Sequence, residues 1–238
     1  MNLLDLALIF VILISVLLGA YRGFVVSALK TASFFVSWIL AYLLHPLLSW
    51  AMSGQGMMQT LINYTEGAAK LPFDTPLAMV TTPITQVDAA TLNDLVSNSS
   101  LVSPFGNLVK SNIASQAFAS QGLSTVGDYF NYTVAYATLN IITFLILFFV
   151  FRIICGVIIN ATDATHKFPV LRHNDVLAGA LTGLLRGVFA CYIIMAVAPI
   201  ALTILNVPVV TDYVLSAPLA GFFYKSNFIL LLMRGKVF

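Results

Sequence analysis

Two pentapeptides of the form Gly-x-x-Arg-Gly, at residues 19–23 and 183–187, carry the residue types most able to do chemistry in this chain. Each sets an arginine, Arg22 or Arg186, between two glycines and just before an apolar run. A charge within membrane hydrocarbon is costly and usually functional, so such an arginine either reaches the lipid headgroups or needs a partner. We interpret Arg22 as a headgroup anchor that fixes the depth of its helix.

Arg186 admits two placements. The apolar segment 176–205 would be about 45 Å long as a helix, about 15 Å more than the hydrocarbon layer requires. If the excess lies on the cytoplasmic side, Arg186 sits at the interface, which is the placement we favour. If the helix instead starts at the interface, Arg186 lies near mid-membrane and needs an acid such as Asp5 or Asp175. Asp5 could equally be an exposed charge favoured by the helix dipole at the N-terminus.

The glycines form a second feature of the same motifs. Gly179, Gly183 and Gly187 recur every four residues, which keeps them near one helix face with a drift of about 40° per step. Gly19 and Gly23 have the same spacing in the first motif. Small residues let helix backbones approach closely in lipid. For each pair of glycines we favour packing within one chain over a contact between two copies. The leading functional hypothesis is a helix-packed, homo-oligomeric membrane assembly that forms through such glycine faces.

The composition restricts the class of protein. Of 238 residues, 60% are hydrophobic and 8% are charged, whereas a soluble domain has about 25% charged residues. The composition therefore argues against a soluble globular enzyme, and we expect lipid to be the solvent for most of the chain. The net charge of +2 gives no basis for a nucleic-acid partner. Cys155 and Cys191 lie in apolar runs and are interpreted as packing residues.

No motif for catalysis or cofactor binding stands out. The sequence has no Gly-rich phosphate cradle and no Ser-His-Asp arrangement. His166 and His173 are seven residues apart, which is not the spacing of metal ligands on one helix face. We therefore expect a non-enzymatic protein with no cofactor and no metal site.

The hydrophobic runs predict an all-α fold, a polytopic membrane helical bundle. A spanning helix needs about 20 mostly apolar residues, and four segments qualify: 3–20, 24–48, 132–159 and 176–205. A weaker stretch, 213–233, fits a short span or a C-terminal amphipathic helix on the membrane surface, and we choose the amphipathic helix. The predicted regions are two spans in 1–50, a polar, partly helical extracytoplasmic segment in 51–131, two spans in 132–205, and a C-terminal interfacial segment in 206–238.

Charge distribution predicts the orientation. Cytoplasmic connections carry an excess of Lys and Arg close to the helix ends. Arg22 and Lys30 mark the first corner, and Arg152, Lys167 and Arg172 mark the connection between the third and fourth spans. Both corners are therefore placed in the cytoplasm. The long segment between the second and third spans has more acidic than basic residues, so we place it outside together with the N-terminus.

The long polar segment is expected to contain short helices of its own, because structureless loops of this length are uncommon. Asp88 is a candidate cap for a helix that runs through Leu95. Residues 106–119 place apolar side chains at intervals that suit one face of a second helix.

These residues together resemble the colicin V production protein (CvpA) family of bacterial inner-membrane proteins. The N-terminal match is an acid near position five, an apolar run and a Gly-x-x-Arg-Gly-Phe turn, here Asp5 to Phe24. The second match is an Asp-Arg-x-x-Gly-x-x-x-Gly-x-x-Arg-Gly signature, except that Val176 replaces its first arginine; it comprises Asp175, Gly179, Gly183, Arg186 and Gly187. The resemblance covers about the first 50 residues and residues 135–205.

The resemblance implies about four spans in the bacterial inner membrane and a role in production or export of a peptide toxin and in envelope homeostasis, with no established enzyme chemistry. The implied partners are the lipid bilayer and proteins of toxin export or of the envelope. Two alternatives stay open. One is a small channel or transporter with an intramembrane site at Arg186, and the other is a sensor or scaffold that uses the outer segment.

Overall fold

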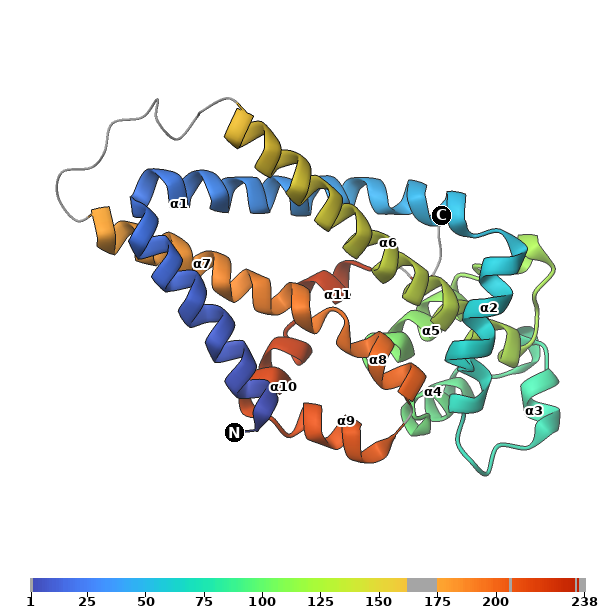
Figure 1. Ribbon diagram of the computed structural model, residues 1–238. Coiled ribbons are helices and arrows are strands. Elements are labelled where there is room, and N and C mark those ends of the chain that lie inside the picture. Colours follow the sequence, from blue (N-terminus) through green and yellow to red (C-terminus); the bar gives the residue numbers. More distant parts are fainter. Residues whose placement is uncertain (1, 162–174, 206, 234, 236–238) are drawn as a thin grey trace. The chain divides into compact units, whose positions relative to one another are not determined.

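A computed structural model describes residues 2–161, 175–205, 207–233 and 235. The predicted connection that contains His166, Lys167, Arg172 and His173 lies outside the described residues. The described chain is all-α, with one isolated bridge between Pro83 and Thr125 (Figure 1). Its helices are α1 (Leu3–Met52), α2 (Gln55–Thr65), η1 (Gly67–Lys70), α3 (Leu77–Thr81), η2 (Ile84–Gln86), α4 (Ala89–Asn98), α5 (Phe105–Ala114), η3 (Ala119–Gln121), α6 (Val126–Ala161), α7 (Asp175–Met195), α8 (Ala198–Leu205), α9 (Pro208–Leu215), α10 (Pro218–Lys225) and α11 (Phe228–Leu232).

The chain folds into two compact units. The membrane unit, as we name the first, comprises residues 1–45, 144–198 and 208–229. The outer unit, named for its predicted location, comprises residues 46–143, 199–207 and 230–238. The boundaries fall inside α1 and α6, so both long helices contribute to each unit.

Helix α1 is bent at the first pentapeptide. Gly23 has φ 75° and ψ 174°, which is not helical, and it separates a first arm (residues 3–22) from a second arm (residues 24–52). Figure 1 shows the sharp turn between the two arms, with the start of α7 beside it. Glycine adopts a positive φ without the steric penalty of a Cβ atom. The bend coincides with the predicted boundary between the first two apolar segments.

Three helical stretches are long and apolar enough to cross a membrane: α1, α6 and Asp175–Leu205. A fourth is present if the C-terminal helices count as one broken span or re-entrant loop, since Pro208–Leu215 and Pro218–Leu232 meet at 92°. The protein is therefore a membrane protein by length and composition of its helices. Helix α1 is one of these three stretches, but each of its two arms is long enough to cross the membrane by itself. The expected total of four spans therefore stays a prediction.

The C-terminal segment is not the single amphipathic helix expected over 213–233. It consists of α9, α10 and α11, all short. Pro208 and Pro218 each begin a helix, and proline cannot sit inside a helix without losing a backbone hydrogen bond. Their expected location on the membrane surface stays a prediction.

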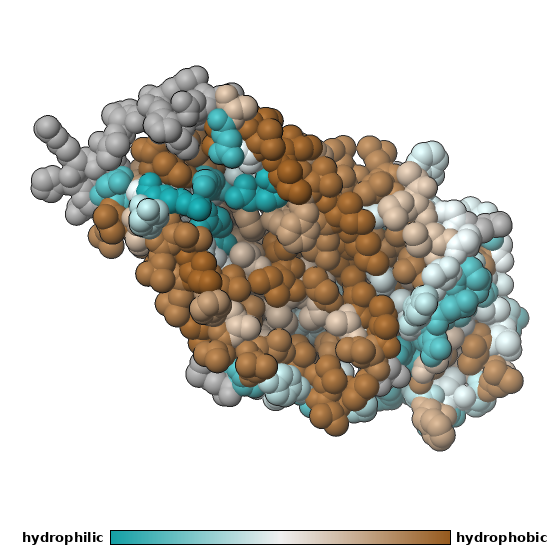
Figure 2. Space-filling model, viewed as in Figure 1, coloured by the Kyte–Doolittle hydropathy of each residue, from teal (hydrophilic) through white to brown (hydrophobic). Residues whose placement is uncertain are grey.

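The interior of the membrane unit is aromatic. Phe34 packs edge-on against Phe148, with ring centroids 5.1 Å apart, and Phe189 lies 5.6 Å from Phe228. The exterior is also apolar, as the brown surface over α1 and α6 shows (Figure 2). An apolar surface of this extent indicates contact with lipid or with another protein.

The outer unit has its own core, in which Phe118, Tyr129 and Phe130 are fully buried. Asp88 caps α4 as expected, because its carboxylate accepts hydrogen bonds from the backbone N–H groups of Ala90 and Thr91. The second expected helix is present as α5, but it spans Phe105–Ala114 and ends before residue 119.

Lys70 of the outer unit is a buried cation. Its side chain is 3% exposed, and its Nζ donates a hydrogen bond to the carbonyl oxygen of Thr203, at 3.1 Å. Burial lowers the pKa of Lys70, because removal from water disfavours the charged amine.

Candidate functional site

The two pentapeptides lie against one another within the membrane unit. A Cβ atom on Gly19 would lie 2.9 Å from the Cα of Gly183, and one on Gly179 would lie 2.9 Å from the carbonyl carbon of Gly23. Carbon atoms in ordinary contact are about 3.5–4.0 Å apart. The two backbones therefore approach too closely for any larger side chain at these positions.

The close contact extends along both helices with an antiparallel register. A Cβ atom on Gly187 would lie 3.0 Å from the Cβ of Ser15, and farther along the Cys191 thiol donates to the carbonyl oxygen of Leu8, at 3.8 Å. The glycine face of α7 is thus occupied by the first arm of α1 in the same chain.

Asp175 closes this face at the bend of α1. Its Oδ1 accepts a hydrogen bond from the backbone N–H of Phe24, at 2.9 Å, and so satisfies a free donor at the start of the second arm. A Cβ atom on Gly23 would collide with the same carboxylate. Gly23 is therefore required both for its positive φ and for the space that Asp175 occupies.

Asp5 binds a different helix end. Its side chain is 0% exposed, and Oδ1 accepts hydrogen bonds from the backbone N–H groups of Leu219 and Ala220, both at 3.0 Å. These donors lie in the first turn of α10, where backbone N–H groups have no partner within the helix. Of the two alternatives for Asp5, the exposed charge is therefore wrong, because Asp5 is buried and binds the start of α10.

Arg186 is paired with a serine. Its Nε donates to Ser15 Oγ at 3.2 Å, and its Nη2 lies 3.5 Å from the Ser15 carbonyl oxygen. Neither Asp5 nor Asp175, the acids expected as partners for a mid-membrane Arg186, forms an ion pair with it among the described residues. Sequence reasoning missed Ser15, although it lies four residues before Gly19 and thus near the same helix face.

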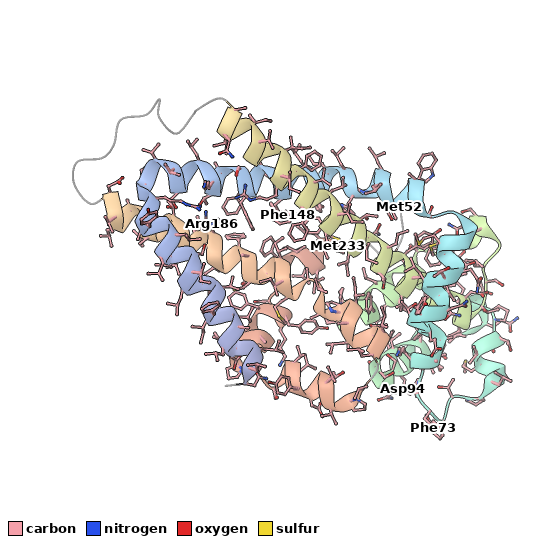
Figure 3. All side chains as sticks on the ribbon, in the orientation of Figure 1. Met52, Phe73, Asp94, Phe148, Arg186 and Met233 are labelled. Carbon is pink, nitrogen blue, oxygen red and sulfur yellow. The ribbon has the colours of Figure 1, made fainter. Side chains whose placement is uncertain are left out.

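Arg186 belongs to a cluster of four cations, with Arg22, Lys30 and Arg152, whose charges interact electrostatically. We call this group the cationic cluster. Arg152 Nη1 donates to Ser33 Oγ at 2.8 Å. Figure 3 shows Arg186 between α7 and α1, and Figure 2 shows a hydrophilic band there within an apolar surface. From the sequence, Lys30 and Arg152 are expected to act only in setting the orientation of the chain.

Within the described ranges, no three His, Cys, Asp or Glu side chains gather as a metal site would require. The residues that the structure brings together are instead glycines, serines and cations on α1, α6 and α7.

A family model described as Colicin V production protein matches residues 4–102 and 109–226 of this chain. The chain belongs to the colicin V production protein family. The resemblance read from the two glycine and arginine motifs is thereby confirmed. The match also covers most of the outer segment, which lay outside the resemblance. No curated protein and no solved structure matches the chain.

Membership in the colicin V production protein family and the apolar helices make this chain a membrane protein of that family. The family is not known as an enzymatic one.

Proposed function

We propose that this family member is a non-enzymatic, multi-pass protein of the bacterial inner membrane that supports production or export of a peptide toxin and envelope homeostasis. The observation that carries the proposal is the family match together with the close packing of its two motifs. The first arm of α1 and α7 form a glycine-packed helix pair that holds Arg186 against Ser15. In this proposal the helix pair is the rigid element of the functional protein.

The proposed orientation places the N-terminus and the outer unit outside and the cationic cluster at the cytoplasmic side. Its support is the excess of positive charge at the corners of the chain. Cysteine accessibility measured from each side of the membrane tests it: a cysteine at Ser97 should react with an impermeant reagent added outside.

A homo-oligomer is part of the proposal, but the glycine faces are not its interface. They are occupied within the chain, so a second copy would have to contact other exposed apolar surfaces, such as those of α1, α6 and α7. The mass of the protein in a mild detergent measures the oligomeric state. A monomer at every concentration tested would remove the oligomer from the proposal.

Complementation tests the function. In a bacterial strain that lacks its own family member and carries a peptide-toxin system, the wild-type chain should restore the growth-inhibition zone and envelope tolerance. Gly183→Leu should fail, because Leu cannot fit between the two helices. Gly156→Leu is the matched control, since a Cβ atom on Gly156 meets nothing within 4 Å. Equal restoration by both variants would remove the helix pair from the mechanism.

A second candidate is a sensor or scaffold that binds a partner through the outer unit. It is favoured by the folded core of that unit and by a polar hollow of about 580 Å³ lined in part by Gln59, Gln121, Tyr132 and Tyr136. Deletion of residues 55–128 discriminates the two candidates. If the chain keeps its function after this deletion, the outer unit is not required for function and the sensor or scaffold candidate is excluded.

A further inference from the structure

The cationic cluster lacks a counter-charge from the described part of the chain. Arg22 and Lys30 come from the two arms of α1, Arg152 from α6 and Arg186 from α7, and no carboxylate is within ion-pair distance of them there. The carboxylate of Asp175 lies at the bend and accepts a hydrogen bond from the backbone N–H of Phe24.

Four like charges on apolar helices repel one another and are costly next to lipid. Serine oxygens orient two of the guanidinium groups, Arg152 through Ser33 and Arg186 through Ser15, but they do not neutralise charge. No carboxylate of the described residues forms an ion pair with these cations, so the cluster is arranged to attract an anion, which would supply a counter-charge.

The cluster borders a hollow of about 320 Å³, lined by Arg22, Lys30, Arg152 and Asn160 together with apolar side chains such as Ile153. Most of the polar groups are donors, namely two guanidinium groups, an ammonium group and the NH2 of the Asn160 amide, and the one acceptor is the carbonyl oxygen of that amide. Guanidinium groups bind phosphate oxygens through two parallel hydrogen bonds, and lysine binds phosphate as a point charge. Guanidinium groups bind carboxylates in the same way, but a phosphate group offers more acceptor oxygens than a carboxylate and can engage several of these donors at once, so the lining matches a phosphate group better.

We propose that this hollow binds a phosphate-bearing anion, held by Arg22, Lys30 and Arg152, and that Arg186, which is not part of the lining, adds its positive charge to the cluster. The phosphate belongs either to the headgroup of an anionic phospholipid or to a free phosphate. The first source is consistent with exposed apolar residues beside the hollow, among them Ile153, because acyl chains can lie against them. This inference goes beyond the proposed role in toxin production and does not depend on it.

The test uses the purified, delipidated full-length chain in a mild non-ionic detergent. One arm measures retention of phosphatidylglycerol and of phosphatidylcholine with the same acyl chains by native mass spectrometry. The other arm titrates inorganic phosphate against chloride at equal ionic strength. Preference for phosphatidylglycerol identifies a lipid headgroup, and phosphate binding without that preference identifies a free anion.

Substitutions locate the site. Arg152→Gln should weaken binding of whichever ligand the wild-type chain binds, phosphatidylglycerol or phosphate, by about tenfold or more. This is the change expected when a charge-assisted hydrogen bond is lost. Lys30→Gln should act in the same direction. Lys225→Gln is the matched control, because it removes one positive charge of the membrane unit outside the cluster and should bind as the wild type does.

Retained helical circular dichroism and elution volume show that a variant is folded. Arg152→Lys keeps the positive charge without the planar guanidinium group, so it should lose less binding affinity than Arg152→Gln. The proposal is overturned if the wild-type chain shows neither preference for phosphatidylglycerol nor binding of phosphate. It is equally overturned if Arg152→Gln and Lys30→Gln bind like Lys225→Gln.

Discussion

Replacing Gly183 with alanine should separate the first arm of α1 from α7. The added Cβ atom would collide with the carbonyl oxygen of Ser15, and it would lie 3.1 Å from the Cα of Val16 and from the carbonyl carbon of Ser15. Carbon atoms in contact are about 3.5–4.0 Å apart, so the carbon contacts alone require the helices to move apart by about 0.4–0.9 Å, and the collision with the oxygen requires at least as much. Such a gap forfeits about a quarter to a half of the dispersion energy of the contacts that it opens.

We expect the strain to destabilise the fold by about 1–3 kcal/mol, the usual cost of overpacking. Alanine in a helix interior recovers about 0.5–1 kcal/mol relative to glycine, so the net loss against the wild type should be about 0–2.5 kcal/mol, and the difference from a glycine-to-alanine change without strain should be about 1–3 kcal/mol. Gly156→Ala is the control, because its Cβ atom meets nothing within 4 Å and only the propensity gain applies.

Unfolding by SDS in mixed micelles measures both variants. Trp38 is a suitable probe because its indole ring lies 5.5 Å from Phe228, between ring centroids. Gly183→Ala should unfold at a lower SDS fraction than the wild type, and Gly156→Ala at the same or a higher one. Coincident unfolding curves for the two variants would refute the close packing of the two motifs.

Further outcomes follow from other contacts. Asp175→Ala removes the acceptor of the Phe24 N–H and should lower the free energy of unfolding by about 0.5–2 kcal/mol, the range for a lost helix cap, in the same SDS assay. The lowered pKa of Lys70 means that the unfolded state binds more protons between that pKa and the ordinary lysine pKa of about 10.4, so stability should rise with pH in this interval. Urea or SDS unfolding at several pH values should show this rise in the wild type and not in Lys70→Met. Sealed vesicles that contain the protein should stay tight to chloride; a flux abolished by Arg186→Gln would instead support the channel alternative.

Local features of the fold could be predicted from the sequence because their causes are local. Apolar runs define the long helices, and Asp88 caps α4 through donors two and three residues away. The bend at Gly23 follows from a glycine and arginine corner between two apolar runs. The motifs also fix which helix faces carry the glycines, because a four-residue step stays near one face.

The partners of these residues could not be predicted, since periodicity identifies a face but not what covers it. Asp5 is bound by donors more than 200 positions away, at Leu219 and Ala220. Arg186 pairs with Ser15 rather than with an acid. The C-terminal segment is divided into α9, α10 and α11, and α9 and α10 begin at Pro208 and Pro218. The amphipathic pattern over the same residues fits a single helix equally well, so it does not predict these breaks.

A disulfide test addresses the central claim, that the two glycine motifs pack against one another in one membrane-embedded chain. Ser15→Cys and Gly187→Cys are combined in a chain whose Cys155 and Cys191 are replaced by alanine, because the two Cβ atoms would lie 3.0 Å apart, close to the separation of about 3.5–4.5 Å in disulfides. Mild oxidation of native membranes should produce a bridge within single chains, seen as a faster monomer band on a non-reducing gel, while Ser15→Cys with Gly156→Cys stays reduced. A dimer band in place of the faster monomer, or no oxidation of the first pair, would contradict the account.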